Sequence, residues 1–540
     1  MKTMKKIVYI FSALLLLLMG SVSCNVTREP EVTPKQKPFE NLKEAQMNRD
    51  AVYALLRSVE SPNNLDGIEI QGDLYHLTFL DNNSLYGLYR WQRQSVQDHD
   101  VILSYYANFY SVLMQANYFM MRAEELKANN TLIKTDDDRA LLDQYVAEMK
   151  IIRALAHWRL IQRFSKPWDG KTDDEPYSGI LMQTEYKPLE NAQAKKASRK
   201  AVYDQILKDL DEAIATLKPD ANKEVTPAIY LTRDYAFAVK ARACLTKQDW
   251  AGAYAAAKEV MDAYPLKDIS SMGTGDKIAE VEKLWRTENS PEILVRLKTT
   301  SQFGAFASRI YAGSLQMVYV NDNDPNDVTM EQTVFRTPAL ILEQWVIDLY
   351  EPMDPRKAAY IGKEDFYYEG TGIPFYTLTK FKGNPSLDKD PKKPEFKLGV
   401  HLFNAGEAYL IAAEAATEEG NIAEAIDAIK QLRLARGASF DSDALQSRDD
   451  VRKFVREERV RELVGEGFHF NDLVRWRVPV KRGESQQSVE AVAEPFGIDA
   501  TVQLDDKYLT VPLDNPMYIW EFPTRDLENN ANLREYRNWK

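Results

Sequence analysis

Cysteine and histidine are scarce in this chain of 540 residues, which has two cysteines and five histidines. Two cysteines exclude the disulfide framework that staples small secreted domains. The histidines lie too far apart in the sequence to predict a zinc site, so we expect no metal and no cofactor. They are His76, His99, His157, His401 and His469.

Long apolar runs and an excess of positive charge are also missing. The one strongly apolar run, residues 7–20, is shorter than the roughly 20 residues that a membrane-spanning helix needs. The formal net charge is -12 and the pI is near 5.3. This balance argues against a basic surface for nucleic acid or anionic lipid.

The common catalytic motifs are absent as well: the sequence has no H-E-x-x-H, no G-x-S-x-G and no phosphate-binding G-x-x-x-x-G-K-[ST]. The acidic stretch 322–327 resembles a calcium loop, but Pro325 and a missing glycine break the pattern, which favours an exposed acidic loop. Glu457 and Glu458 are adjacent acids among arginines. Because adjacent side chains on a helix diverge, an ion-pair network is favoured over the paired carboxylates of a glycosidase. We therefore expect no catalytic residues and no enzyme.

The amino terminus has the three-part order of a secretory signal. Lysines at positions 2, 5 and 6 precede the apolar run, and the small residues 21–23 lead into Cys24. A cysteine at the first mature position can carry a diacylglyceryl group, so we predict a lipoprotein signal peptide over 1–23 and lipid attachment at Cys24. An ordinary cleavage site with a chance cysteine is the alternative. Residues 24–41, rich in Pro, Thr, Lys and Glu, predict a flexible tether.

Helical periodicity dominates the rest of the chain. Over Val101 to Ala128, apolar residues recur at the three-and-four spacing of one helix face. Thr135 followed by three aspartates predicts an N-cap with acids in the first turn, and that helix is expected to run to about Phe164. Cys244 falls in an Ala-rich helix and is expected to behave as a small buried apolar residue.

Two later segments share a finer pattern of small residues, a short turn and a second helix. One spans Tyr235 to Pro265 with its turn at 248–249, and the other spans Asn404 to Gly437 with its turn at 420–421. Both predict tetratricopeptide-type helical hairpins, in which small residues let two helices approach closely. An ordinary helical bundle is the alternative.

The segment between the hairpins, residues 290–397, has clusters of Pro, Gly, Asn and Asp and short β-favouring runs at 292–297 and 375–381. Binding residues tend to lie on loops carried by a rigid scaffold. We expect ligand-binding residues in this segment and in the aromatic segment 74–91. Aromatic rings stack on sugars or pack against peptide side chains, and amide groups fix the orientation of the ligand. The candidate ligand-binding residues are Tyr75, Asn82, Asn83, Tyr86, Tyr89 and Trp91, with ordinary packing as the alternative for each aromatic.

The stretch Glu458 to Gly467, continuing through Asp472-Leu473 to Arg475-Trp476, resembles the carboxyl-terminal signature of the SusD/RagB family. Further segments agree in order along essentially the whole mature chain. His469 departs from the arginine usual in the family. The carboxyl-terminal segment also differs from the usual family ending. This segment and two early segments are most similar to the RagB branch. The agreeing segments are 115–117, 153–154, 206–214, 407–410 and 413–415, and the RagB-like ones are 48–50, 53–57 and 520–526.

The resemblance implies a mostly α, SusD-like fold with tetratricopeptide-like hairpins and a loop-rich, partly β side facing ligand. It implies one domain over 42–540, with a helical part at 42–289 and a loop-rich and carboxyl-terminal part at 290–540. It also implies a lipoprotein on the outside of the outer membrane that captures oligosaccharides or oligopeptides. Its partner would be a SusC/RagA-like TonB-dependent barrel. A cell-surface glycoside hydrolase or peptidase, or a tetratricopeptide-type scaffold, are the alternatives.

Overall fold

The computed structural model divides into two units, Met1–Glu40 and Asn41–Lys540, of which the second holds all the elements named below. The predicted signal peptide, Cys24 and most of the tether lie outside the residues that the structure describes. Those residues are 38–77, 85–129, 131–170, 175, 177–187, 193–219, 227–287, 289–299, 314–319, 332–337, 340–368, 371–388, 397–483 and 510–539.

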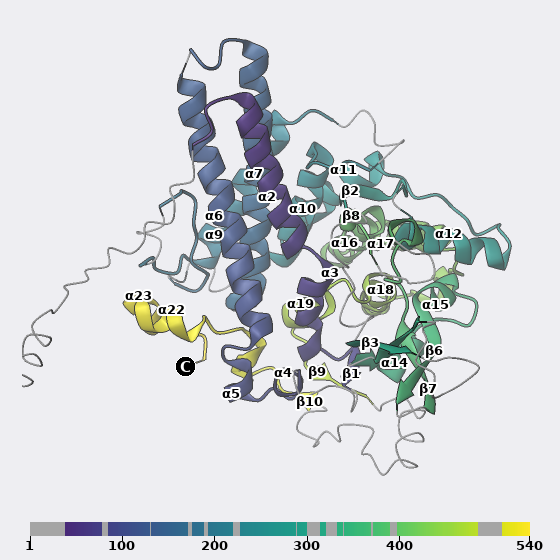
Figure 1. The fold of residues 1–540 in the computed structure, drawn as a ribbon. Helices are drawn as coiled ribbons and strands as arrows, with labels where there is room; N and C mark the ends of the chain where they lie inside the picture. Colours follow the sequence, from purple (N-terminus) through teal and green to yellow (C-terminus); the bar gives the residue numbers. More distant parts are fainter. Residues whose placement is uncertain are drawn as a thin grey trace, which may run out of the picture. The chain divides into compact units, whose positions relative to one another are not determined.

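Two helices of 29 residues each, α6 (Asp100–Ala128) and α7 (Asp136–Phe164), pack against each other along their length (Figure 1). The side chain of Thr135 accepts a hydrogen bond from the backbone of Asp138, which confirms the predicted cap, and α7 ends at Phe164 as expected. On either side of the pair lie α2 (Leu42–Val59) and α9 (Arg199–Thr216).

The two predicted helical hairpins are present. The first consists of α10 (Arg233–Thr246) and α11 (Trp250–Ala263), and the second of α16 (Ala405–Glu419) and α17 (Ile422–Ala435). Gly420 ends α16 in the left-handed conformation, φ 88°, which glycine adopts without steric cost. The two hairpins stack directly, α11 on α16, because alanines line the facing surfaces. Cys244 is buried in α10, as predicted, and burial raises the pKa of its thiol to about 12.

The strands are short and pair two by two. Each of the five antiparallel pairs among the described residues is an isolated ribbon, so no large sheet forms there. The predicted β runs appear as β2 and β7. The pairs are β1 (Tyr75–Leu77) with β5 (Leu340–Leu342), β2 (Ile293–Leu297) with β8 (Val400–Asn404), β3 (Ser314–Tyr319) with β4 (Gln332–Thr337), β6 (Ile361–Tyr368) with β7 (Thr371–Leu378), and β9 (Val480–Lys481) with β10 (Thr510–Val511).

The ribbon of β2 and β8 contacts α10 and α16 of the two hairpins directly, and α18 (Arg448–Leu463) packs on α16. The signature stretch forms the end of α18, the turn after it and α19 (His469–Trp476). The mostly α fold class, with helical hairpins and a loop-rich part, is thereby confirmed. The remaining helices are α3 (Pro62–Leu65), η1 (Asp66–Gln71), α4 (Tyr86–Tyr89), α5 (Arg93–Val96), α12 (Thr274–Arg286), α14 (Gln344–Asp348), α15 (Pro355–Tyr360), η2 (Pro385–Leu387), η3 (Ser442–Ala444), η5 (Pro516–Tyr518), α22 (Thr524–Asn529) and α23 (Ala531–Arg534).

Candidate functional site

The structure corrects the prediction for three of the candidate aromatic residues. Tyr75, Tyr89 and Trp91 are 1%, 0% and 4% exposed, so their rings belong to the core and offer no face to a ligand. Tyr86 is partly exposed. The candidate amides of Asn82 and Asn83 fall in 78–84, outside the described residues.

Trp91 is held in the core by polar and aromatic contacts. Its indole Nε1 donates to the Gln71 carbonyl at 3.2 Å. Its ring meets those of Phe470 and Tyr518 edge-on, with centroids 5.8 and 4.7 Å away. Edge-to-face pairs of this kind add stability beyond the buried area. Trp91 therefore fastens the end of the aromatic segment to α19 and η5.

Arg482 binds both flanks of the stretch 78–84. Its buried guanidinium donates to the carbonyls of Ile70, Gly72 and Tyr89 at 3.2, 2.9 and 2.7 Å and lies 3.7 Å above the Tyr89 ring. A buried cation is costly unless its donors are satisfied, and here carbonyls and a ring face satisfy them. The sequence analysis missed this residue, because no local pattern links position 482 to position 89.

A second buried polar network joins η1, β9 and α19. His469 Nε2 lies 2.7 Å from Asp73 Oδ1, and the His469 backbone N–H donates to Glu69 Oε1 at 2.9 Å. The Lys481 backbone N–H donates to the other Asp73 oxygen at 3.0 Å. Burial alone would lower the pKa of His469, but the adjacent Asp73 carboxylate outweighs it and raises that pKa. Burial also raises the pKa of Glu69, to about 7.

These shifts predict a fall in stability as the pH rises. Imidazolium at His469 stabilises the fold below the ordinary histidine pKa, and this contribution is lost as the pH passes the raised value. Glu69 is favoured in its protonated form, so its ionisation destabilises the fold between pH 4.5 and about 7. This rise in the pKa of Glu69 corresponds to a loss of about 3 kcal/mol in the free energy of unfolding. Glu69→Gln should abolish that part of the pH dependence, as measured by urea unfolding at pH 5 and pH 8.

Glu419→Gln, at an exposed carboxylate on α16, is the control for the Glu69 experiment and should follow the wild type at both pH values. If Glu69→Gln changed the free energy of unfolding equally at pH 5 and pH 8, Glu69 would not titrate in this range and the assignment would be wrong.

Two partly exposed aromatic side chains belong to elements that contact this network. Tyr86 lies on α4, with the Arg90 guanidinium 4.2 Å from its ring centre. Trp345 on α14 is partly exposed, and its Nε1 donates to the Asp73 carbonyl at 3.0 Å. That bond orients the indole and leaves part of it accessible. Trp345 was not among the predicted residues, because a lone tryptophan in a short helix gives no local signal.

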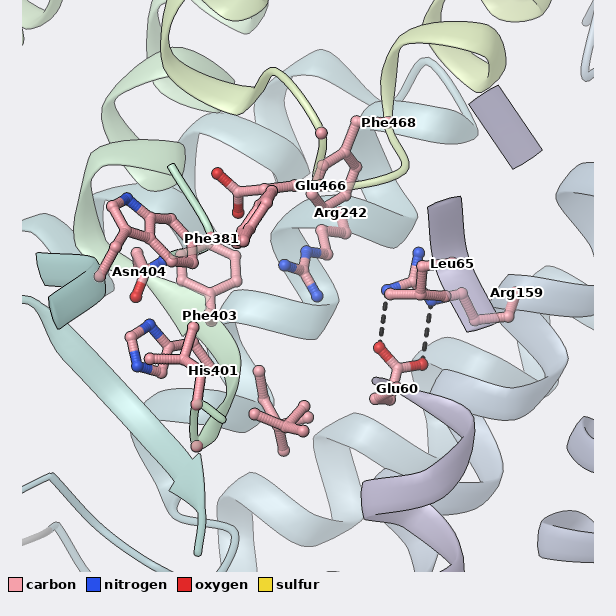
Figure 2. A pocket seen from close by; sticks show the side chains of 16 residues that line it. Glu60, Leu65, Arg159, Arg242, Phe381, His401, Phe403, Asn404, Glu466 and Phe468 are labelled. Atoms are coloured by element: carbon pink, nitrogen blue, oxygen red, sulfur yellow. Dashed lines mark hydrogen bonds and ion pairs between the residues drawn. The ribbon is translucent and has the colours of Figure 1, made fainter. Parts of the chain in front are cut away.

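A cavity of about 40 Å³ lies between α7, α10 and β8, and both apolar and charged side chains line it (Figure 2). In it Arg159 donates to both oxygens of Glu60, at 3.0 and 2.6 Å. Burial lowers the pKa of His401 to about 3, so this imidazole is neutral. The volume suits one or two water molecules and is too small for a sugar ring or a peptide side chain.

A larger pocket of about 370 Å³ lies beside Tyr518, the ring against which Trp91 packs. Lys166 and Arg477 contribute cationic side chains, and Asn515 and Pro516 form part of its rim. Trp91 thus packs against a ring that lines this pocket.

The carboxylates of α18 form the ion-pair network that the sequence predicted. Glu458 is 0% exposed and contacts Arg356, Arg433 and Arg461 at 2.8, 3.2 and 2.9 Å. Burial opposes ionisation, but these three guanidinium groups outweigh it and hold the pKa of Glu458 down at about 2. A carboxylate fixed in its ionised form and closed off from solvent cannot serve as the general acid of a hydrolase.

Two absences hold for the residues that the structure describes. No group of three or more His, Cys, Asp or Glu side chains among them could hold a metal ion. Within the same residues, no helix has the length and apolar character to cross a membrane.

Two family models match the chain and together cover more than half of it. One describes the SusD family and matches residues 376–539, and the other describes starch-binding proteins associating with the outer membrane and matches residues 43–245. SusD-like protein P38 from Formosa agariphila is 23% identical over 400 residues, which are 68% of this chain and 71% of that protein.

Solved structures share the fold at low sequence identity. A SusD superfamily protein from Bacteroides thetaiotaomicron has a TM-score of 0.69 at 19% identity, with 91% of this chain and 98% of that one covered. A SusD-like carbohydrate-binding protein from Bacteroides vulgatus also has a TM-score of 0.69, at 18% identity over 92% and 98%. A laminarin-binding SusD-like protein has a TM-score of 0.62 at 20% identity over 91% and 98%.

Proposed function

The chain belongs to the SusD family, and from this membership we propose that it is a lipid-anchored outer-membrane protein that captures extracellular glycans. It is a binding protein and not an enzyme, in line with the carbohydrate-binding relatives. The proposed anchor is a diacylglyceryl group on Cys24, followed by the tether 24–41. Family membership is the observation that carries the proposal.

We further propose that the protein passes its ligand to a SusC/RagA-like TonB-dependent barrel on the outer face of the membrane. A groove of about 990 Å³ between α7, α9 and residues 227–232 supports a protein partner. Leu141 and Ile229, in this groove, are 37% and 46% exposed. Exposed apolar side chains within a large groove are typical of surfaces that bind other proteins.

The ligand site that we propose has Tyr86 and Trp345 as aromatic surfaces, with Asn82 and Asn83 as polar partners. The buried contacts of Arg482 support it, because they hold Tyr89, the last residue of the short helix that carries Tyr86, before ligand arrives. A binding residue that is already held in place loses less entropy when ligand binds. Rings of this type stack on the apolar face of a sugar.

Tyr86→Ala should weaken glycan binding about 3- to 10-fold, the contribution of one aromatic contact. Calorimetry with a panel of oligosaccharides that includes laminarin fragments, and with oligopeptides as the competing ligand class, measures this effect. Tyr86→Phe keeps the ring and should retain most of the affinity. Tyr254→Ala, which removes a partly exposed tyrosine from α11, should bind as the wild type does.

Binding of peptides and of no glycan would overturn the proposed ligand class. If the wild type and Tyr86→Ala bound a glycan with equal affinity, Tyr86 would not belong to the site, but the proposed glycan-binding function would still hold.

A further inference from the structure

A further pocket lies between α6 and α22, formed by residues outside the segment 74–91. Its volume is about 430 Å³, which is within the range of small-ligand sites. In the view of Figure 1, α22 lies on one side of α6, while α14 and β1 lie on the other. We call it the α6–α22 pocket; its lining includes Tyr106, Tyr110, Gln183, Arg525, Asp526 and Asn529.

The wall on α6 is aromatic and rigid. Tyr106 and Tyr110 are one helical turn apart, and their ring centres are 4.6 Å from each other. The Tyr110 hydroxyl donates to the Leu181 carbonyl at 3.1 Å, which fixes the ring. Tyr106 is 8% exposed and donates its hydroxyl to Asp526, while Tyr110 is partly exposed. The rings of Tyr106 and Tyr110 are therefore held in place on the α6 side of the pocket.

Three side chains that line the pocket offer hydrogen-bonding groups that the protein itself does not use. Arg525 and Asn529 are one turn apart on α22, and Gln183 comes from the extended segment after α7. Among the described residues, these three side chains form no hydrogen bond or ion pair, whereas most polar side chains of the neighbouring loops do. They present a guanidinium and two amides to the same space.

The short helix that carries Arg525 and Asn529 is fixed by other bonds. The Gln193 side chain donates to the Asn529 carbonyl at 3.0 Å. The Asn530 side chain donates to the Ala194 carbonyl at 2.8 Å, and Leu527 and Leu533 are buried beneath the helix. The walls are thus ordered without a ligand, which lowers the entropic cost of binding one.

We propose that the α6–α22 pocket is a second sugar-binding site, which holds one or two pyranose units of the glycan captured by the protein. Guanidinium and amide groups bind pairs of sugar hydroxyls, and a tyrosine ring packs against the apolar sugar face. Arg525 and Asp526 bring opposite charges, so the pocket suits a neutral sugar. This inference rests on the proposed glycan-binding function, and it adds a second contact on the same chain that increases the avidity for a long glycan.

The experiment compares the wild type with the double variant Arg525→Ala/Asn529→Ala, using calorimetry with the bound oligosaccharide of the panel. The wild type should bind two short oligosaccharides per chain and the double variant one. Tyr86→Ala should weaken the other site and leave this one unchanged. Arg537→Ala, which removes an exposed arginine outside the pocket, is the matched control and should keep both sites.

A direct reporter lies in the pocket itself. Met114 lines it, so the ¹³C-methyl NMR signal of Met114, assigned with Met114→Leu, should shift when oligosaccharide is added to the wild type. The signal should stay in place in the double variant. One oligosaccharide per wild-type chain with no Met114 shift would overturn the second site alone. No binding of any glycan by the wild type would overturn the proposed function together with it.

Discussion

Replacing Arg356 with leucine is expected to lower the free energy of unfolding by about 3–5 kcal/mol, the usual effect of removing one partner from a buried ion pair. Arg356 is 0% exposed and contacts Asp354, Glu458 and Glu462 at 2.8, 2.8 and 3.0 Å. Without the guanidinium, Asp354 loses its bidentate partner and remains closed off from water. Chemical unfolding in urea at neutral pH measures the change.

Arg452→Leu is the matched control. Arg452 lies on α18, the helix that also carries Glu458 and Glu462. Arg452 pairs with Glu418 but is partly exposed, so its loss should lower the free energy of unfolding by less than about 1 kcal/mol. Equal effects of the two substitutions would contradict the prediction. Such a result would mean that burial among carboxylates does not make Arg356 more important for stability than a partly exposed arginine.

The network also illustrates what the sequence could predict. Glu458 stands among arginines on a helix, and that local pattern was enough to favour an ion-pair network over a catalytic pair. Its partners Arg356 and Arg433 come from α15 and α17, and their identity depends on how distant segments pack. The type of interaction was therefore local information, whereas its geometry was not.

The helices were predicted well for the same reason. The cap at Thr135, the end of α7 at Phe164 and the turn at Gly420 depend on side chains within four residues of each other. Small residues in both hairpins indicated close helix packing, and the alanines of α11 and α16 lie where that packing occurs.

The aromatic segment shows where this kind of prediction fails. A stretch rich in tyrosine and tryptophan has the same sequence whether its rings point into the core or outward. The direction was decided by Arg482 and Phe470, which lie almost 400 positions away along the chain and close the core over Tyr89 and Trp91. Tyr86, by contrast, has its ring against Arg90 of the same helical turn and is partly exposed.

Trp91→Ala is therefore expected to act on stability and to lower the free energy of unfolding by about 3–5 kcal/mol, as truncation of a buried aromatic side chain does. The substitution removes the contacts with Phe470 and Tyr518 and the hydrogen bond to Gln71. Urea unfolding of this variant and of Trp91→Phe measures the effect. Phenylalanine keeps most of the buried area, so that variant should lose clearly less.

The comparison with Tyr86→Ala separates the two roles within one short segment. A residue of the ligand surface changes affinity at nearly constant stability, whereas a core residue changes stability and affects binding only as the folded fraction falls. Under conditions where Trp91→Ala remains folded, its affinity for glycan should stay within about 3-fold of the wild type, less than the loss of one direct aromatic contact. Full stability together with a large loss of affinity would place Trp91 at the ligand after all. In that case the core packing around Gln71 and Tyr518 would have to open when the glycan binds.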